Sequence, residues 1–146
     1  MIVTFKIKMG AMKIWMFTLC MMCCLTTHAQ RLENRSYSTI GYINSDGRVQ
    51  NSSYKTIGYI NEDGRVQNSS YRTIGYINSN GRIQNSSYST LGYVREDGTI
   101  QNSSYSTIGY IKDNGNVQDK SYRTIGYAKG VKKEWAAAVY FFFEFE

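Results

Sequence analysis

The sequence predicts an all-β fold of five repeated antiparallel β-hairpins, arranged radially, with an aromatic C-terminal tail packed on their centre. Three observations predict it. The motif Tyr-x-Thr-Ile-Gly-Tyr (Leu for Ile in one copy) returns every 17 residues from Tyr37 to Tyr122. A turn ending in glycine separates successive copies, and Trp135 to Phe143 is a continuous apolar run. A short fixed period indicates one supersecondary unit copied along the chain, each copy burying its apolar face on its neighbours.

Residues 1–29 are predicted to be a cleaved secretory signal peptide. Basic residues lie between positions 6 and 13, a mostly apolar run covers positions 14–25, and Thr27 and Ala29 place small residues before the cleavage point. The apolar run is shorter than the ~20 residues that a transmembrane helix needs. We therefore expect an exported protein, periplasmic or extracellular, with no transmembrane span in the mature chain.

Loss of the signal peptide simplifies the chemistry of the chain. It removes all three cysteines and the single histidine, so disulfides, thiolate sites, imidazole bases and ordinary zinc sites are not expected. Three of the 17 basic residues leave with it, and 14 then face 11 acidic residues along the repeats. Basic and acidic side chains alternate rather than forming a basic stripe, which argues against a nucleic-acid partner. We expect no cofactor and no metal.

Each repeat has the pattern of a hairpin. Thr, Ile and Tyr favour strands, and Asp-Gly or Asn-Gly is a strong hairpin signal. A type I turn with its glycine in the left-handed conformation sets Ile43 opposite Val49, and this pair is apolar in every copy. Alternation then directs Ile40 and Tyr42 away from the face that carries Ile43. The turn glycines are Gly47, Gly64, Gly81, Gly98 and Gly115.

A second set of glycines lies inside the strand pattern. Glycine at such a position marks a bulge, a bend or the close approach of another backbone. Six copies at one spacing suggest crowding around a common centre, and a ligand contact is the alternative. The inner glycines are Gly41, Gly58, Gly75, Gly92, Gly109 and Gly126.

The domain is predicted to be a single unit, residues 30–146, without a linker. Hairpin repeats cover about 37–121, residues 31–36 and 122–128 are closing strands, and residues 129–146 form the tail. Segment 31–36 aligns with the second strand of a unit and segment 122–128 with the first. The two half-units can therefore pair and close a ring without free edges, whereas an open array would need capped ends.

The repeat Tyr-x-Thr-Ile-Gly-Tyr-Ile, followed by Asp-Gly-x-Val-Gln-Asn-Ser-Ser, resembles that of the five-fold β-flower proteins, small secreted proteins of gut bacteria in which hairpins radiate as petals. The resemblance covers residues 31–135, and the five turn glycines match five petals. It implies a fold and an export route. It implies no activity.

No catalytic residues are predicted. The adjacent pairs Glu62-Asp63 and Glu96-Asp97 fall on turns, where solvation explains them better than acid–base chemistry. The Asn-x-Ser sequences at strand ends are interpreted as polar residues that bond neighbouring backbone, with glycosylation as the alternative. The predicted function is a non-enzymatic structural or binding module. The alternatives are a multivalent carbohydrate-binding module and, third, a carboxylate-dependent hydrolase.

The candidate binding residues are repeated tyrosines and arginines. A tyrosine offers an apolar face and a polar tip, which sugar and protein ligands both use, and repetition raises avidity. The competing interpretation is that these rings form the core. The aromatic tail is predicted to cover the centre of the flower. The alternatives are docking to a membrane surface or a partner, and self-association through residues 135–145. The candidate binding residues are Tyr42, Tyr59, Tyr76, Tyr93, Tyr110, Arg48, Arg65 and Arg82.

Overall fold

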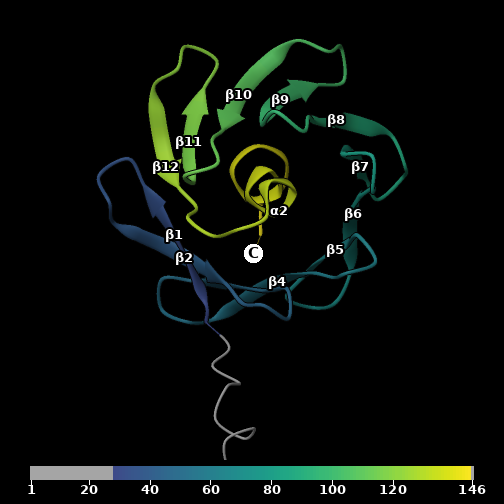
Figure 1. The fold of residues 1–146 in the computed structure, drawn as a ribbon. Coiled ribbons are helices and arrows are strands. Elements are labelled where there is room, and N and C mark those ends of the chain that lie inside the picture. Colours follow the sequence, from purple (N-terminus) through teal and green to yellow (C-terminus); the bar gives the residue numbers. More distant parts are fainter. Residues whose placement is uncertain (1–27, 146) are drawn as a thin grey trace, which may run out of the picture.

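The computed structural model describes residues 28–145, so nearly all of the predicted signal peptide lies outside the described residues. Twelve strands surround a short axial helix (Figure 1). The strands are β1 (Gln30–Asn34), β2 (Thr39–Ile43), β3 (Arg48–Asn51), β4 (Thr56–Ile60), β5 (Arg65–Asn68), β6 (Thr73–Ile77), β7 (Arg82–Asn85), β8 (Thr90–Val94), β9 (Thr99–Asn102), β10 (Thr107–Ile111), β11 (Asn116–Asp119) and β12 (Thr124–Tyr127). The tail forms α2 (Lys133–Ala137) and the π-helical turn η1 (Ala138–Phe142).

The strands form one closed antiparallel barrel, in which each strand pairs with both of its neighbours. The repeated hairpins that the sequence predicted are thus joined edge to edge in one closed barrel. The terminal strands β1 and β12 close the ring, with Asn34 opposite Gly126. This pairing repeats the one inside each hairpin, where Asn51 lies opposite Gly41. The barrel thus has five continuous hairpins and a sixth assembled from the two ends of the repeat array.

The register inside each hairpin is the predicted one. Ile43 lies opposite Val49, and the Asn44 amide donates to the Arg48 carbonyl across the turn. Between hairpins the register shifts: Val49 pairs with Gly58 and Gln50 pairs with Thr56, so Ile57 is an extra residue in a bulge. Ile57 and its counterparts in later repeats consequently leave the alternation and pack against the core. The prediction that this position points away from the face of Ile43 holds for Ile40, which is 42% exposed, but not for its later counterparts, because the sequence pattern does not reveal the bulge.

The core is built from two layers of complementary size. In the first layer, aliphatic side chains of successive strands surround Ala136, Ala137 and Ala138, which have no exposed surface. Toward the other end of the barrel, the first strand of each hairpin carries an inner glycine, which has no side chain. Aromatic rings of the tail fill the space beside these glycines. Large wall residues thus face small axial residues, and glycines face rings.

Five of the six inner glycines each face one tail ring. A β-carbon added at Gly58, Gly75, Gly92, Gly109 or Gly126 would lie within 3.0 Å of a ring atom of Phe145, Phe143, Phe142, Phe141 or Tyr140, respectively. The rings follow one another along the tail in the reverse of the order in which the hairpins follow one another along the chain. The Phe143 amide donates to the Ala138 carbonyl, an i to i+5 bond that widens the helical turn. A wider turn rotates successive side chains by a smaller angle, which helps them meet successive hairpins.

The turn glycines connect each hairpin to the next. Their φ angles lie between 81° and 87°, a region that favours glycine. The Gly47 carbonyl accepts from the Ile60 amide at 2.8 Å, and the equivalent bond recurs around the barrel. A side chain at Gly47 would collide with the Ile60 carbonyl. Backbone conformation and close packing therefore both require glycine at this position.

Candidate binding surface

Six stacked tyrosine pairs surround the outside of the barrel. Each joins a strand tyrosine to a tyrosine of the connecting loop, with ring centroids 4.4–4.8 Å apart and ring planes within 16° of parallel. The loop tyrosines are well exposed, at 59–66% of their surface. The pairs, called here the tyrosine belt, are Tyr42–Tyr54, Tyr59–Tyr71, Tyr76–Tyr88, Tyr93–Tyr105, Tyr110–Tyr122 and Tyr127–Tyr37.

The loop tyrosines adopt a left-handed backbone conformation. Their φ angles are 61–64°, a conformation that costs a residue with a β-carbon roughly 1–2 kcal/mol. Hydrogen bonds from adjacent polar residues hold the loop in place. The Asn51 side-chain oxygen accepts from the Ser53 and Lys55 amides, and the Gln50 side chain donates to the Tyr54 carbonyl. The strand-end asparagines therefore cap the loops, as the sequence predicted.

The paired hydroxyls bond to each other. Tyr42 and Tyr54 hydroxyl oxygens lie 3.0 Å apart, and Tyr59 and Tyr71 lie 2.9 Å apart. This bond, followed by burial, raises the pKa of Tyr42 and of Tyr59 above the ordinary tyrosine value. Tyr42 and Tyr59 are therefore uncharged at neutral pH, and each pair presents an apolar face with two polar tips.

The predicted arginines lie beside the tyrosines of the following repeat. Arg48 is the cross-strand partner of Tyr59, and the same relation joins Arg65 to Tyr76 and Arg82 to Tyr93. Aspartates of the turns partly engage two of them: Arg48 lies 3.9 Å from Asp46, and Arg65 lies 3.2 Å from Asp63. Threonine and asparagine replace arginine in the last two repeats, at Thr99 and Asn116. In these repeats cationic side chains of the turns lie over strand tyrosines instead: Arg95 lies 5.6 Å from the centre of the Tyr93 ring, and Lys112 lies 5.3 Å from that of Tyr110.

The structure brings all eight candidate binding residues to the outer surface, and the five tyrosines among them belong to stacked pairs that the sequence interpretation did not foresee. The prediction included the strand tyrosines Tyr42, Tyr59, Tyr76, Tyr93 and Tyr110. It omitted their loop partners, which are more exposed, and it missed the sixth pair across the seam between β1 and β12. The recurrence of a second tyrosine 12 residues after each strand tyrosine was the available signal.

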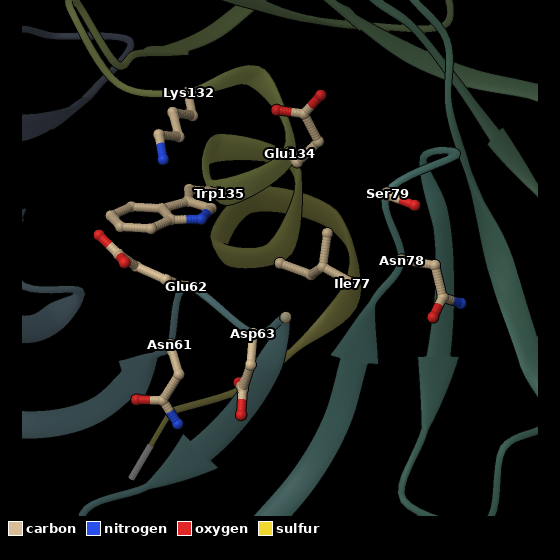
Figure 2. Close-up of a pocket in the computed structure, with 10 residues that line it drawn as sticks. Asn61, Glu62, Asp63, Ile77, Asn78, Ser79, Lys132, Glu134 and Trp135 are labelled. Carbon is tan, nitrogen blue, oxygen red and sulfur yellow. The ribbon is translucent and has the colours of Figure 1, made fainter.

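A pocket of about 300 Å³ opens where the tail enters the barrel (Figure 2). Its walls are the turns after β4 and β6, and its floor includes Ile77 and Trp135. The Lys132 ammonium lies 4.8 Å from the centre of the Trp135 ring, a cation–π contact. Glu62 and Glu134 also line the pocket.

The carboxylate pairs considered for hydrolysis lie on exposed turns. Glu62-Asp63 belongs to the turn after β4, and Glu96-Asp97 to the turn after β8. Hydrogen bonds from the Thr99 backbone and side chain lower the pKa of Asp97 below its usual range. Within residues 28–145, His, Cys, Asp and Glu form no group of three or more that could hold a metal ion.

Comparison with protein families fits this architecture. The family model described as "5-fold beta-flower protein" matches residues 29–144. The chain belongs to this β-flower family. No curated protein and no solved structure matches it. In this β-flower protein the five continuous hairpins are completed by the composite hairpin of β12 and β1, which lets the sheet close.

The two helical segments among the described residues of this β-flower protein, α2 and η1, are short. Among the described residues, none is both long and apolar enough to cross a membrane.

Proposed function

We propose that this β-flower protein is an exported, non-enzymatic binding module whose tyrosine belt docks carbohydrate chains. The observation that carries the proposal is the exposed tyrosine pair in every unit, retained although each loop tyrosine has a strained backbone. Strain that recurs at an exposed position is a common mark of a functional surface. A carbohydrate ligand fits because aromatic faces stack on the apolar faces of sugars, while neighbouring polar groups bond their hydroxyls.

Each pair has polar groups of the required kind beside it. Tyr59 lies between Arg48 on one neighbouring strand and Gln67 on the other. The arginine guanidinium donates hydrogen bonds to hydroxyls and carboxylates, and the glutamine amide both donates to hydroxyls and accepts from them. Because the belt repeats the site around the barrel, one extended chain or several chain ends can occupy more than one pair. Such multivalency raises avidity without any new contact.

Export and the lack of catalysis are parts of the same proposal. The basic and apolar start of the sequence supports export. The scatter of carboxylates over solvent-exposed turns supports a binding role rather than hydrolysis. Because the tail fills the interior of the barrel, a ligand would bind at the outer tyrosine belt or in the pocket beside Trp135.

The test is a binding survey of soluble polysaccharides with residues 30–146. We expect binding that weakens steeply when Tyr54, Tyr71 and Tyr88 are together replaced by Asn, which tolerates the left-handed backbone. The matched control replaces the neighbouring exposed Ser53, Ser70 and Ser87 by Ala and keeps full binding. Absence of binding at millimolar sugar would reject the carbohydrate ligand. Release of reducing ends during the incubation would reject the non-enzymatic role.

A further inference from the structure

We propose that the stacked tyrosine pairs are sites of oxidative cross-linking, at which a one-electron oxidant converts each pair to dityrosine within the molecule. The inference rests on ring geometry and is independent of the proposed function. Dityrosine is a bond between the ring carbons next to the two hydroxyl-bearing carbons. Rings that are parallel, 4.4–4.8 Å apart, and joined hydroxyl to hydroxyl bring these carbons face to face.

The pairs are both accessible and held in place. Tyr54 has 63% of its surface exposed, so an oxidant in solution reaches it. Its carbonyl accepts from the Gln50 side chain at 2.8 Å, and its amide donates to the Asn51 carbonyl at 3.0 Å. A radical formed on Tyr54 therefore has its stacked partner Tyr42 as the nearest phenol. Coupling inside the pair is then a unimolecular step that outruns collisions between molecules.

The chemistry balances with hydrogen peroxide and a peroxidase as the oxidant. Each phenol loses one electron and one proton and becomes a phenoxyl radical. The two radicals join through one carbon–carbon bond, and the hydrogen on each bonded carbon moves to oxygen and restores both phenols. Two electrons and two protons leave the pair in total, and they reduce one peroxide molecule to two waters. The protein loses two hydrogen atoms per cross-link.

The pair Tyr37–Tyr127 is the most informative because it lies across the seam. Its ring centroids are 4.4 Å apart, the shortest separation of the six pairs. The other pairs join residues 12 positions apart, as in Tyr42–Tyr54, whereas this pair joins the first repeat to the last. A bond here fastens the two ends of the barrel covalently. Closing a long loop restricts the unfolded chain more than closing a short one.

The experiment treats residues 30–146 with peroxidase and a limiting amount of peroxide. We expect dityrosine fluorescence, a mass loss of two hydrogens per cross-link, and a digest containing the peptide pair that holds Tyr37 and Tyr127. The denatured product should run faster on a gel than the untreated chain, and its melting temperature should rise. The yield of dityrosine per protein molecule should not change when the protein is diluted, because the cross-link forms within one molecule.

The matched variants are Tyr127→Phe and Tyr54→Phe, each of which keeps an aromatic ring but cannot form a phenoxyl radical. Tyr127→Phe should lose the Tyr37–Tyr127 peptide, the faster gel migration and the rise in melting temperature. Tyr54→Phe should lose only the Tyr42–Tyr54 peptide. Cross-links found mainly between molecules, peptides that join tyrosines of different pairs, or no dityrosine in the folded protein would each overturn the proposal.

Discussion

The hydroxyl oxygen of Tyr140 lies 2.7 Å from the carbonyl oxygen of Glu33 and 3.0 Å from that of Tyr127. One tail side chain therefore donates toward both strands of the seam, Glu33 in β1 and Tyr127 in β12. The seam has two paired positions, fewer than the three between β2 and β3. The tail thus reinforces the closure that joins the two ends of the barrel.

Replacing Tyr140 by Phe should destabilise the protein by about 1 kcal/mol, the usual net value of a buried hydrogen bond. The aromatic ring stays packed against Gly126, so the loss of stability measures the contribution of the hydroxyl group alone. The free energy of unfolding in urea measures it. Tyr54→Phe, which removes an exposed hydroxyl, is the control and should change stability less. If both variants lost the same unfolding free energy, the Tyr140 hydroxyl would not reinforce the seam between β1 and β12.

Alkaline pH should weaken the fold through the same residue. Burial raises the pKa of Tyr140 to about 12, above an unfolded value of about 10. The native state therefore favours the neutral phenol, so this stabilisation is complete below pH 10 and is lost as the pH rises toward 12. Unfolding free energies across that range should fall more steeply for the parent than for Tyr140→Phe. If the unfolding free energies of the two proteins fell in parallel as the pH rose, Tyr140 would not contribute to this pH dependence.

The pairing of inner glycines with tail rings predicts a coupling between Gly75 and Phe143. Gly75→Ala should cost about 1–3 kcal/mol by overpacking, and Phe143→Ala about 3–5 kcal/mol by leaving a cavity. The double variant should cost less than the sum, because loss of the ring relieves the contact of the added methyl with Phe143, although the contact with the Gln84 carbonyl remains. Gly41→Ala combined with Phe143→Ala is the control: the nearest atoms to its added carbon belong to the Gln50 and Asn51 backbone. If the changes in unfolding free energy were additive in both double-mutant cycles, the proposed contact between Gly75 and the Phe143 ring would be contradicted.

Two left-handed positions should respond in opposite ways to substitution. Gly81→Val should destabilise by more than ~1 kcal/mol, because valine is strained at φ 81° and its side chain meets the Val94 carbonyl. Tyr88→Asn should stay within about 1 kcal/mol of the parent, since relief of backbone strain offsets the lost ring stacking. Thermal and urea unfolding of the two single variants measures both changes. A tolerated Gly81→Val would refute the bulged turn.

Removal of the tail should abolish the compact fold. Burying one large apolar side chain contributes roughly 1.5–3 kcal/mol, so several tail rings contribute an amount comparable with the 5–15 kcal/mol that stabilises a small domain. A chain of residues 30–133 should be poorly soluble or molten, with dye-accessible apolar surface and a weak near-ultraviolet circular dichroism signal. If it stays folded and monomeric, the tail is a docking segment instead.

The sequence by itself determined the repeat, the hairpins, their turns and their register. These features depend on contacts within about a dozen residues, and each has a local chemical signature, such as Asp-Gly at the turn or Ile43 opposite Val49. The sequence also indicated that 31–36 and 122–128 could close a ring, because both segments align with the repeat. It placed the candidate tyrosines and arginines on repeated positions of one surface.

Only the tertiary structure decided how the units combine. The bulge at Ile57 appears only when two hairpins share an edge, and it turns this side chain toward the core. The stacking of Tyr37 on Tyr127 depends on closure of the barrel, and the facing of Phe143 and Gly75 depends on the path of the tail. These residues are distant in the chain, so no local pattern relates them. Their contacts form because the closed barrel leaves its axis lined by glycine, where aromatic side chains fill the remaining volume.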